Sequence, residues 1–256
     1  MKLLFNSFKI LFIATLLLLS CSSSSDLDEL PIVQTERIIK FSGYDWLVRT
    51  SNDVRLGPGP NLFSDSEDNV WVDDNGHMHL KIVHKGNGWY CAGVILRRSL
   101  GYGKYIFHVG SDVTKLDENV VGGLFTYLND EEEIDIEFSR WSNPNSEDSQ
   151  FAVQPSHLPG NKVRYDLHLL TDRSTHAFDW RADRIDFFSR QGHGLTVDDE
   201  NLIREWTYQG NHVPPHRGTE RLRMNLWLFR GEAPSNGEEQ EMIIEKFEFI
   251  KAEGSN

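Results

Sequence analysis

The chain carries, at residues 133–138, the sequence EIDIEF, in which three acids alternate with three bulky apolar residues. Strict alternation is the period of a β-strand, whose side chains point to opposite faces in turn. Glu133, Asp135 and Glu137 therefore share one face of the predicted strand, and neighbouring carboxylates raise one another's pKa. A carboxylate pair needs separated pKa values to act as nucleophile and proton donor. A solvated strand face is the other interpretation, because the chain holds 39 Asp and Glu in 256 residues.

The sequence around this motif also has the pattern of short β-strands. Its β-branched and aromatic runs predict strands at 70–72, 79–83, 105–109, 121–127, 133–140, 149–153, 174–180, 183–189, 221–228 and 242–250. Asp74-Asn75-Gly76 lies between the first two and indicates a tight turn. No stretch has an amphipathic helical period. The pattern predicts an all-β sandwich or barrel, formed as one domain over residues 37–252.

The N-terminus has the features of an export signal rather than of the fold. Lys2 and Lys9 flank a mostly apolar run that is short for a membrane span and ends LLLLSC at Cys21. The run resembles the lipobox of bacterial lipoproteins, with Leu19 larger than usual. We expect a signal peptide at 1–20, a lipidated Cys21 and a flexible tether over 21–36. A plain signal peptide and an uncleaved anchor are the alternatives.

Export and composition limit the partners of the chain. The net charge is −13, and cleavage before Cys21 would remove two lysines, so a nucleic-acid partner is excluded on charge. The same acidity argues more weakly against a sulfated substrate, since a groove can be locally basic, and neutral substrates fit best. With Cys21 lipidated, Cys91 has no disulfide partner. The ten histidines show no metal-ligand spacing, so no metal site is predicted.

Spacing alone leaves open which two of the three acids would act. Positions i and i+2 of a strand lie about 6.6 Å apart, and i and i+4 about 13 Å. A retaining glycosidase needs two carboxylates about 5–5.5 Å apart, and an inverting one needs a wider gap. Adjacent acids fit this reach directly, whereas Glu133 and Glu137 converge only if the sheet is concave.

The motif resembles the EIDIEF signature of glycoside hydrolase family 16, particularly its bacterial licheninases. The likeness covers roughly residues 57–230 and includes, in the family's order, YCA at 90–92, GYG at 101–103, LFTY at 124–127, QF at 150–151, AFDW at 177–180 and MNLW at 224–227. The resemblance implies a β-jelly-roll sandwich of two curved antiparallel sheets, concanavalin-like, with a glycan groove on the concave face. It implies that Glu133 is the nucleophile, that Glu137 is the general acid/base with a raised pKa, and that Asp135 tunes Glu133.

The resemblance also implies the substrate contacts. Sugar rings present apolar C–H faces and polar edges, so a glycan groove needs flat aromatics beside amides. The matched positions are Asn61, Phe125, Tyr127, Gln150, Asn225 and Trp227. Each aromatic could instead be ordinary core, as is usual for Phe. Family members often carry a structural calcium, whose position this sequence does not mark, and no other cofactor is expected.

The chain departs from licheninases at several places. Gly93 and Ile95 stand where a Glu and an Arg hold a glucose unit, and Glu131 replaces a Trp. Arg97 and Arg98, or Arg140 with Trp141, could replace those contacts. Ser174 and His176 share one strand face near a family His. The substrate is therefore expected to differ from β-1,3-1,4-glucan.

The sequence supports two hypotheses about function. The first is a monomeric, retaining, endo-acting hydrolase of a β-linked polysaccharide, lipid-anchored to a bacterial outer membrane and touching it only through the lipid. The second is a non-catalytic carbohydrate-binding surface lipoprotein on the same fold, which would not need three acids.

Overall fold

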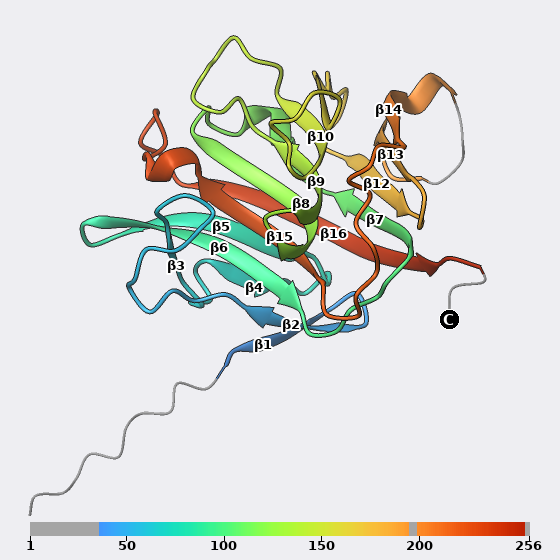
Figure 1. The fold of residues 1–256 in the computed structure, drawn as a ribbon. Helices are drawn as coiled ribbons and strands as arrows, with labels where there is room; N and C mark the ends of the chain where they lie inside the picture. Colours follow the sequence, from blue (N-terminus) through green and yellow to red (C-terminus); the bar gives the residue numbers. More distant parts are fainter. Residues whose placement is uncertain (1–35, 195–198, 254–256) are drawn as a thin grey trace, which may run out of the picture. The chain divides into compact units, whose positions relative to one another are not determined.

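A computed structural model describes residues 36–194 and 199–253 of the chain. The predicted signal peptide, Cys21 and all of the tether except Glu36 lie outside these residues. The described residues form one unit with continuous strand pairing (Figure 1). Within them, no helix is both long and apolar enough to cross a membrane.

The first sheet carries the acidic motif and is antiparallel throughout. Its strands run, side by side, in the order β1 (Ile38–Phe41), β2 (Tyr44–Val48), β6 (Gly88–Leu96), β15 (Arg221–Leu228), β8 (Val120–Asn129), β9 (Glu132–Phe138), β10 (Ser149–Val153) and β11 (Lys162–Tyr165). The motif strand β9 thus lies inside the sheet, paired on both edges.

The second sheet packs behind the first. Its order is β4 (Val70–Val72), β5 (Met78–Lys85), β16 (Gln240–Lys251), β7 (Gly103–Val109), β12 (Ser174–Trp180), β13 (Ile185–Gln191) and β14 (Leu202–Tyr208). Three one-turn 3-10 helices, η1 (Val113–Lys115), η2 (Asp199–Asn201) and η3 (Phe229–Gly231), lie in the connections.

One hairpin ties the two sheets together. The start of β6 pairs with β5, and its later residues pair with β15 and β2 in the first sheet. The short strand β3 (Leu62–Phe63) runs parallel beside β6 at Cys91, the free and fully buried cysteine of the described residues. Burial raises the pKa of the Cys91 thiol to about 12, so the thiol stays protonated.

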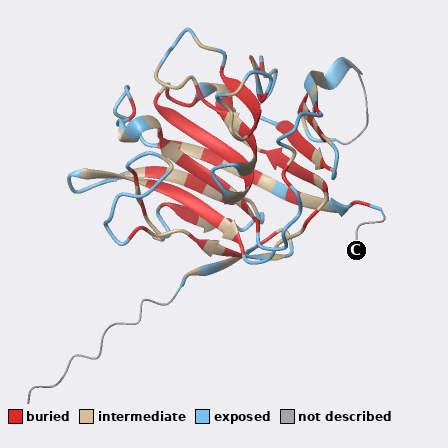
Figure 2. Ribbon diagram, viewed as in Figure 1, coloured by how far each residue is buried: buried red, intermediate tan, exposed pale blue. Residues whose placement is uncertain are grey.

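The core fills the space between the sheets, and Figure 2 shows burial concentrated in the central strands while the connecting loops are exposed. Phe151 of β10 stacks on Phe187 of β13, with ring centroids 5.0 Å apart. Phe138 of β9 meets the His176 ring edge-on at 4.7 Å. These cross-sheet contacts bury the apolar face of β9. The fold is the all-β jelly roll that the resemblance implied.

The predicted strands are observed, with ends shifted by a few residues. The predicted turn at Asp74-Asn75-Gly76 joins β4 to β5 but is longer than a two-residue turn, since the Gly76 N–H donates to the Asp73 carbonyl and Asp73 N–H to His77. Gly76 has a positive φ of 82°, while Asn75 does not. The Asp73 side chain accepts hydrogen bonds from the backbone N–H groups of Asn75 and His77. These bonds hold the turn without the positive φ that was expected at Asn75.

Candidate active site

The two faces of β9 have opposite environments. Ile134, Ile136 and Phe138 are fully buried against the second sheet. Glu133, Asp135 and Glu137 point to the other face, where they line a groove. The alternation predicted from the sequence is therefore the alternation that the strand shows, and the solvated-face interpretation is wrong for these three acids.

Pairing across the sheet sets the neighbours of each acid, because residues directly opposite on antiparallel strands share a face. Glu137 lies between Gly123 of β8 and Gln150 of β10. Asp135 lies between Phe125 and Ala152. Glu133, at the open end of the strand, lies opposite Tyr127. Small residues at 123 and 152 leave space beside Glu137 and Asp135.

The groove encloses about 530 Å³ over the centre of this sheet. Its floor comes from β8, β9 and β15, and one wall comes from the loop after β2. The lining residues are Arg49, Leu56, Gly57, Pro58, Gly123, Phe125, Tyr127, Asp130, Glu133, Asp135, Glu137, Arg223, Asn225 and Trp227. Aromatic, amide and charged groups thus surround the acids, as a glycan groove requires.

Two glutamines orient the acids. The Gln150 amide N–H donates to Glu137, and the Gln154 amide N–H donates to Asp135 at 3.0 Å. Behind Gln150, the Arg164 Nε donates to the Gln150 carbonyl oxygen at 3.2 Å. The Arg164 guanidinium in turn lies 3.8 Å from the centre of the Trp141 ring. A chain of contacts therefore runs from Trp141 through Arg164 and Gln150 to Glu137.

Burial governs the protonation of the three acids. Burial, and then repulsion from Glu137, raise the pKa of Glu133 to about 8, against the lowering effects of a hydrogen bond with Asp135 and of Arg223. Burial and both glutamates raise the pKa of Asp135 well above its usual range. Burial also raises the pKa of Glu137, opposed by the Gln150 hydrogen bond and by Arg164. The pKa is thus raised at all three acids, as the mutual repulsion of neighbouring carboxylates predicted, and at Glu137, as the resemblance implied. The hydrogen bond between the Asp135 and Glu133 carboxyl groups needs one proton between them.

Four of the six predicted substrate-contact residues line the groove: Phe125, Tyr127, Asn225 and Trp227. Gln150 lies beside it and holds Glu137. Asn61 is buried, and its amide nitrogen donates to the carbonyls of Pro58 and Leu228, both at 2.8 Å. Asn61 therefore anchors the loop that carries Gly57 and Pro58, and its direct contact with a substrate stays a prediction.

Five residues in or next to the candidate site were not predicted from the sequence: Arg49, Arg223, Gln154, Arg164 and Asp130. Arg223 had a signal, since β15 alternates strictly and places residues 223, 225 and 227 on one face. Gln154 is two residues beyond Ala152 in the same alternation. No sequence signal pointed to Arg49, because its position depends on the pairing of β2 with β6, which lies far along the chain.

The candidate replacements for the missing licheninase contacts lie away from the groove. Arg140 donates to the carbonyls of Leu116 and Thr114. The Arg98 guanidinium lies 5.1 Å from the Tyr44 ring centre, and Arg97 is exposed without lining the groove. Glu131 is exposed in the β8–β9 turn. Of the proposed replacements, Trp141 alone connects to the acids, through Arg164.

Ser174 and His176 share a strand face, as expected, and that face is in the core. His176 is fully buried, with its ring nitrogens 2.8 Å from the Ser174 hydroxyl and 2.6 Å from the Ser189 hydroxyl. Burial lowers the pKa of His176 to about 3, so its ring is neutral. The pair supports the back of β9 through Phe138 and does not reach the groove.

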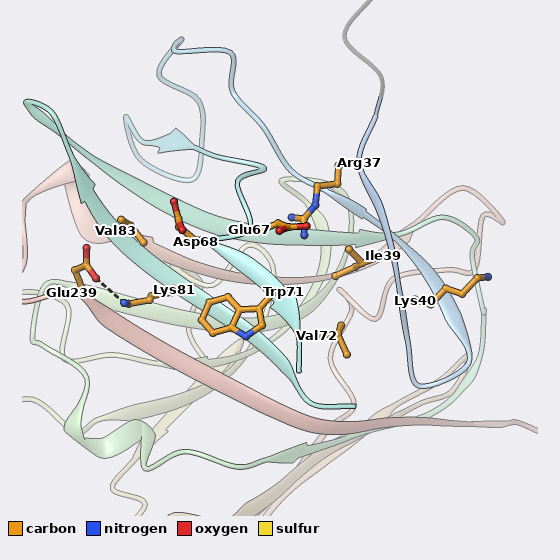
Figure 3. Close-up of a pocket in the computed structure, with 10 residues that line it drawn as sticks. All are labelled: Arg37, Ile39, Lys40, Glu67, Asp68, Trp71, Val72, Lys81, Val83 and Glu239. Atoms are coloured by element: carbon orange, nitrogen blue, oxygen red, sulfur yellow. Dashed lines mark ion pairs between the residues drawn. The ribbon is translucent and has the colours of Figure 1, made fainter. Parts of the chain in front are cut away.

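A larger hollow, of about 870 Å³, lies between β1, β4, β5 and the start of β16 (Figure 3). In this hollow Lys81 pairs with Glu239 at 2.7 Å, and Arg37 donates to backbone carbonyls, among them those of Asp65 and Val70. Trp71 stacks on His79 at 4.4 Å. The three acids of the hollow, Glu67, Asp68 and Glu239, lie in loops rather than in a row on one strand face, and Glu239 is paired with Lys81, so we place the candidate active site in the smaller groove.

Within residues 36–194 and 199–253, no group of three or more His, Cys, Asp or Glu side chains could hold a metal ion. A structural calcium stays a prediction.

No family profile and no curated protein matches the chain. Solved structures do. The β-glucanase of Bacillus licheniformis is 19% identical, with a TM-score of 0.60 over 80% of this chain and 92% of that one. A prokaryotic β-1,3-1,4-glucanase (lichenase) from a mouse hindgut metagenome is 19% identical, with a TM-score of 0.59 over 85% and 100% of the two chains.

A third similar structure is an immunostimulatory antigen and pseudo β-1,3-glucanase of Mycobacterium tuberculosis. It is 16% identical, with a TM-score of 0.60 over 81% of this chain and 91% of that one. At these identities the likeness shows a shared fold. That fold is used by proteins described as glucanases and by one described as a pseudo-glucanase.

Proposed function

We propose that this protein is a retaining, endo-acting glycoside hydrolase that cleaves a β-linked polysaccharide by double displacement. The observation that carries the proposal is the row of three carboxylates along one face of β9, with Asp135 buried and Glu133 and Glu137 half-buried, on the floor of an open groove. The groove supplies both aromatic faces and amides for a sugar chain. No cofactor is needed, because the carboxylates can perform every step.

Glu133 acts as the nucleophile and Glu137 as the general acid/base. In the first step the proton shared by Glu133 and Asp135 lies on Asp135, the ionised Glu133 attacks the anomeric carbon through one oxygen, the glycosidic C–O bond breaks, and Glu137 gives its proton to the leaving oxygen. In the second step Glu137 takes a proton from water, which displaces Glu133 from the sugar. The proton that Asp135 shares with Glu133 stabilises the leaving carboxylate.

Tyr127, Phe125 and Trp227 provide the ring faces on which sugars stack, and Asn225 supplies an amide between them. Gln150 positions Glu137 and keeps its carboxylate oriented during both proton transfers. The Trp141–Arg164 pair extends this support toward the far edge of the sheet.

The second candidate is a non-catalytic carbohydrate-binding protein. The observation that favours it is the similarity to a structure described as a pseudo β-1,3-glucanase. This candidate uses the same aromatic and amide groups but has no use for three acids whose burial costs free energy.

One substitution separates the two candidates. We expect Glu133→Gln to lower turnover by several orders of magnitude, at about 1.4 kcal/mol per decade, while polysaccharide binding remains. Reducing-sugar release by the parent chain over a panel of neutral and charged polysaccharides comes first. Proton NMR of early product should then show the β-anomer forming before the α-anomer. Near-parental turnover by Glu133→Gln, or α-anomer first, would refute the assignment, and no release by the parent on any polysaccharide would favour the binding protein.

Export with lipidation of Cys21, and anchoring of the domain to a bacterial outer membrane, is part of the proposal. Its support is the lipobox-like sequence before Cys21. We expect Cys21→Ala to move the protein from the membrane fraction to the soluble fraction. Retention in the membrane fraction would refute lipidation.

A further inference from the structure

Two arginines face the groove a short way from the acids. Arg223 lies on β15 directly opposite Phe125, which itself lies opposite Asp135. Arg49 follows β2, and its backbone N–H donates to the Gly93 carbonyl on β6. Both side chains line the groove.

Neither arginine is paired with a carboxylate within residues 36–194 and 199–253. The Arg49 guanidinium lies 3.8 Å from the Phe63 ring centre and donates to the Gly57 carbonyl. The Arg223 guanidinium lies 4.2 Å from the Tyr127 ring centre, and its buried Nε has no partner. Partial burial and mutual repulsion lower the pKa of Arg49 to about 10, so the two cations are close enough to disfavour each other.

The sequence around the arginines makes room for them. Gly93 lacks a side chain, and a Cβ at this position would come within 2.6 Å of the Asn225 Oδ1 and 3.4 Å of the Arg49 Cδ. Asn225 is 1% exposed, and neither its Oδ1 nor its Nδ2 has a partner. Among the described residues, two cations without a carboxylate partner therefore lie near a buried amide whose oxygen and nitrogen both lack a hydrogen-bond partner, and all three side chains line the groove.

We propose that the part of the groove formed by Arg49, Arg223 and Asn225 binds an anionic substituent of the polysaccharide, either a sulfate ester or a uronate carboxylate. Guanidinium groups match the planar or tetrahedral oxygens of such anions and bind them through charge-assisted hydrogen bonds. An acidic protein can hold a locally positive site, because a groove with low-dielectric walls concentrates the field of nearby charges. The inference rests on the proposed hydrolase and replaces the expectation of a neutral substrate.

The competing explanation is that Arg223 only offsets the buried acids, since it lowers the pKa of Glu133. The two explanations differ in what they predict for substrates. A residue that tunes Glu133 affects the cleavage of every substrate by the same factor. A residue that binds an anionic substituent affects only substrates that carry one.

The test uses the full chain and matched substrate pairs: a sulfated galactan with its desulfated form, and a uronate-containing glycan with its carboxyl-reduced form. The variants are Arg223→Gln, Arg49→Gln and Arg223→Lys. Arg97→Gln makes the same change of charge outside the groove and serves as the control. The quantity compared is the ratio of kcat/KM for the charged form to that for its neutral form.

We expect the parent to prefer the charged form of one pair, which identifies the anion. Arg223→Gln and Arg49→Gln should each lower the ratio roughly tenfold to a hundredfold, the range for one charge-assisted hydrogen bond. Arg223→Lys should recover part of the ratio, and Arg97→Gln should leave it unchanged. A parent that prefers both neutral forms, or a ratio unchanged in both glutamine variants, would overturn the inference.

Binding separates failure of this inference from failure of the proposed function. Calorimetric titration of Glu133→Gln with each charged glycan needs no turnover. If the parent cleaves nothing but the titration shows binding that is lost on adding Arg223→Gln, the anionic site stands and the hydrolase is refuted. If the parent cleaves neutral chains alone and the titration shows no binding of charged ones, the hydrolase stands and the anionic site is refuted.

Discussion

At the scale of single residues, the acids proposed to carry out the chemistry also lower the stability of the fold. Burial is the main cause that raises the pKa of Glu133 from its ordinary value of 4.5 to about 8. Its carboxyl group therefore holds a proton in the folded chain at pH values where the unfolded chain has lost it. Stability falls with rising pH wherever the folded state binds more protons, so this group destabilises the fold progressively between about pH 4.5 and 8.

Glu133→Gln should remove this cost. Each unit of pKa shift corresponds to about 1.4 kcal/mol, and coupling to Asp135 and Glu137 shares the effect among the three groups. We expect the variant to be more stable than the parent by roughly 1–3 kcal/mol at pH 8, with the gain shrinking toward pH 4.5. Urea denaturation at several pH values measures it. Glu131→Gln, in the exposed turn, should change stability by less than about 0.5 kcal/mol at every pH; a gain for Glu133→Gln that did not depend on pH would contradict the burial argument.

A second prediction at this scale concerns Gly93, Ile95 and Glu131, which replace a Glu, an Arg and a Trp of the licheninases. Charge-assisted hydrogen bonds are worth roughly 1.5–3 kcal/mol each, so a glucose unit that loses two of them is bound about a hundredfold or more weakly in the transition state. We expect poor cleavage of mixed-linkage β-glucan compared with at least one other β-linked polysaccharide. Cleavage of barley-type glucan with kcat/KM in the upper part of the usual range of roughly 10⁴–10⁸ M⁻¹s⁻¹ would contradict it.

At the scale of the strand, β9 has a face for chemistry and a face for stability. Ile136 is fully buried and lies opposite Leu124 and Phe151 in the core. Ile136→Ala should cost about 2–5 kcal/mol, because the cavity left behind cannot close fully. The midpoint of thermal unfolding should fall by about 5–15 °C, at roughly 2–4 °C per kcal/mol for a domain of this size.

The matched control is Ile250→Ala, whose parent side chain is 53% exposed near the end of β16. It should shift the midpoint by a degree or two at most. Folded Ile136→Ala should keep its turnover at low temperature, since no groove residue is altered. Equal destabilisation by the two substitutions would mean that the back of β9 is not packed as described.

Alternation along single strands explains what the sequence could predict. It placed Glu133, Asp135 and Glu137 on one face, and Asn225 with Trp227 on another strand, because a period of two needs only local information. The row that crosses the sheet, from Arg164 through Gln150, Glu137, Gly123 and Asn225 to Gly93, depends on the register of separate strands. That register joins residues up to about 130 positions apart, so neither the Arg164–Gln150–Glu137 chain nor the place of Arg49 could be read from spacing.

At the scale of the whole molecule, the jelly roll holds the acids on a central strand and forms part of the groove wall from a loop. The acids lie on β9, an interior strand paired with β8 on one side and β10 on the other. The groove wall formed by Leu56, Gly57 and Pro58 comes from a loop, which Asn61 fixes through two backbone carbonyls. A change of substrate therefore needs new loop residues, such as those around Gly57 or at Arg49, with β9 unchanged.

Because the β5–β6 hairpin joins the two sheets, the rate at which the Cys91 thiol is labelled reports unfolding of the domain. The thiol reacts as a thiolate, and burial both hides the sulfur and keeps its proton in place. A thiol reagent can reach it only when β6 leaves its partners, and β6 belongs to both sheets. Fraying of outer strands such as β14 should therefore leave the labelling rate unchanged, while Ile136→Ala should speed labelling by about tenfold for every 1.4 kcal/mol of stability lost. Measured in native buffer, that rate would report how often the two sheets come apart together.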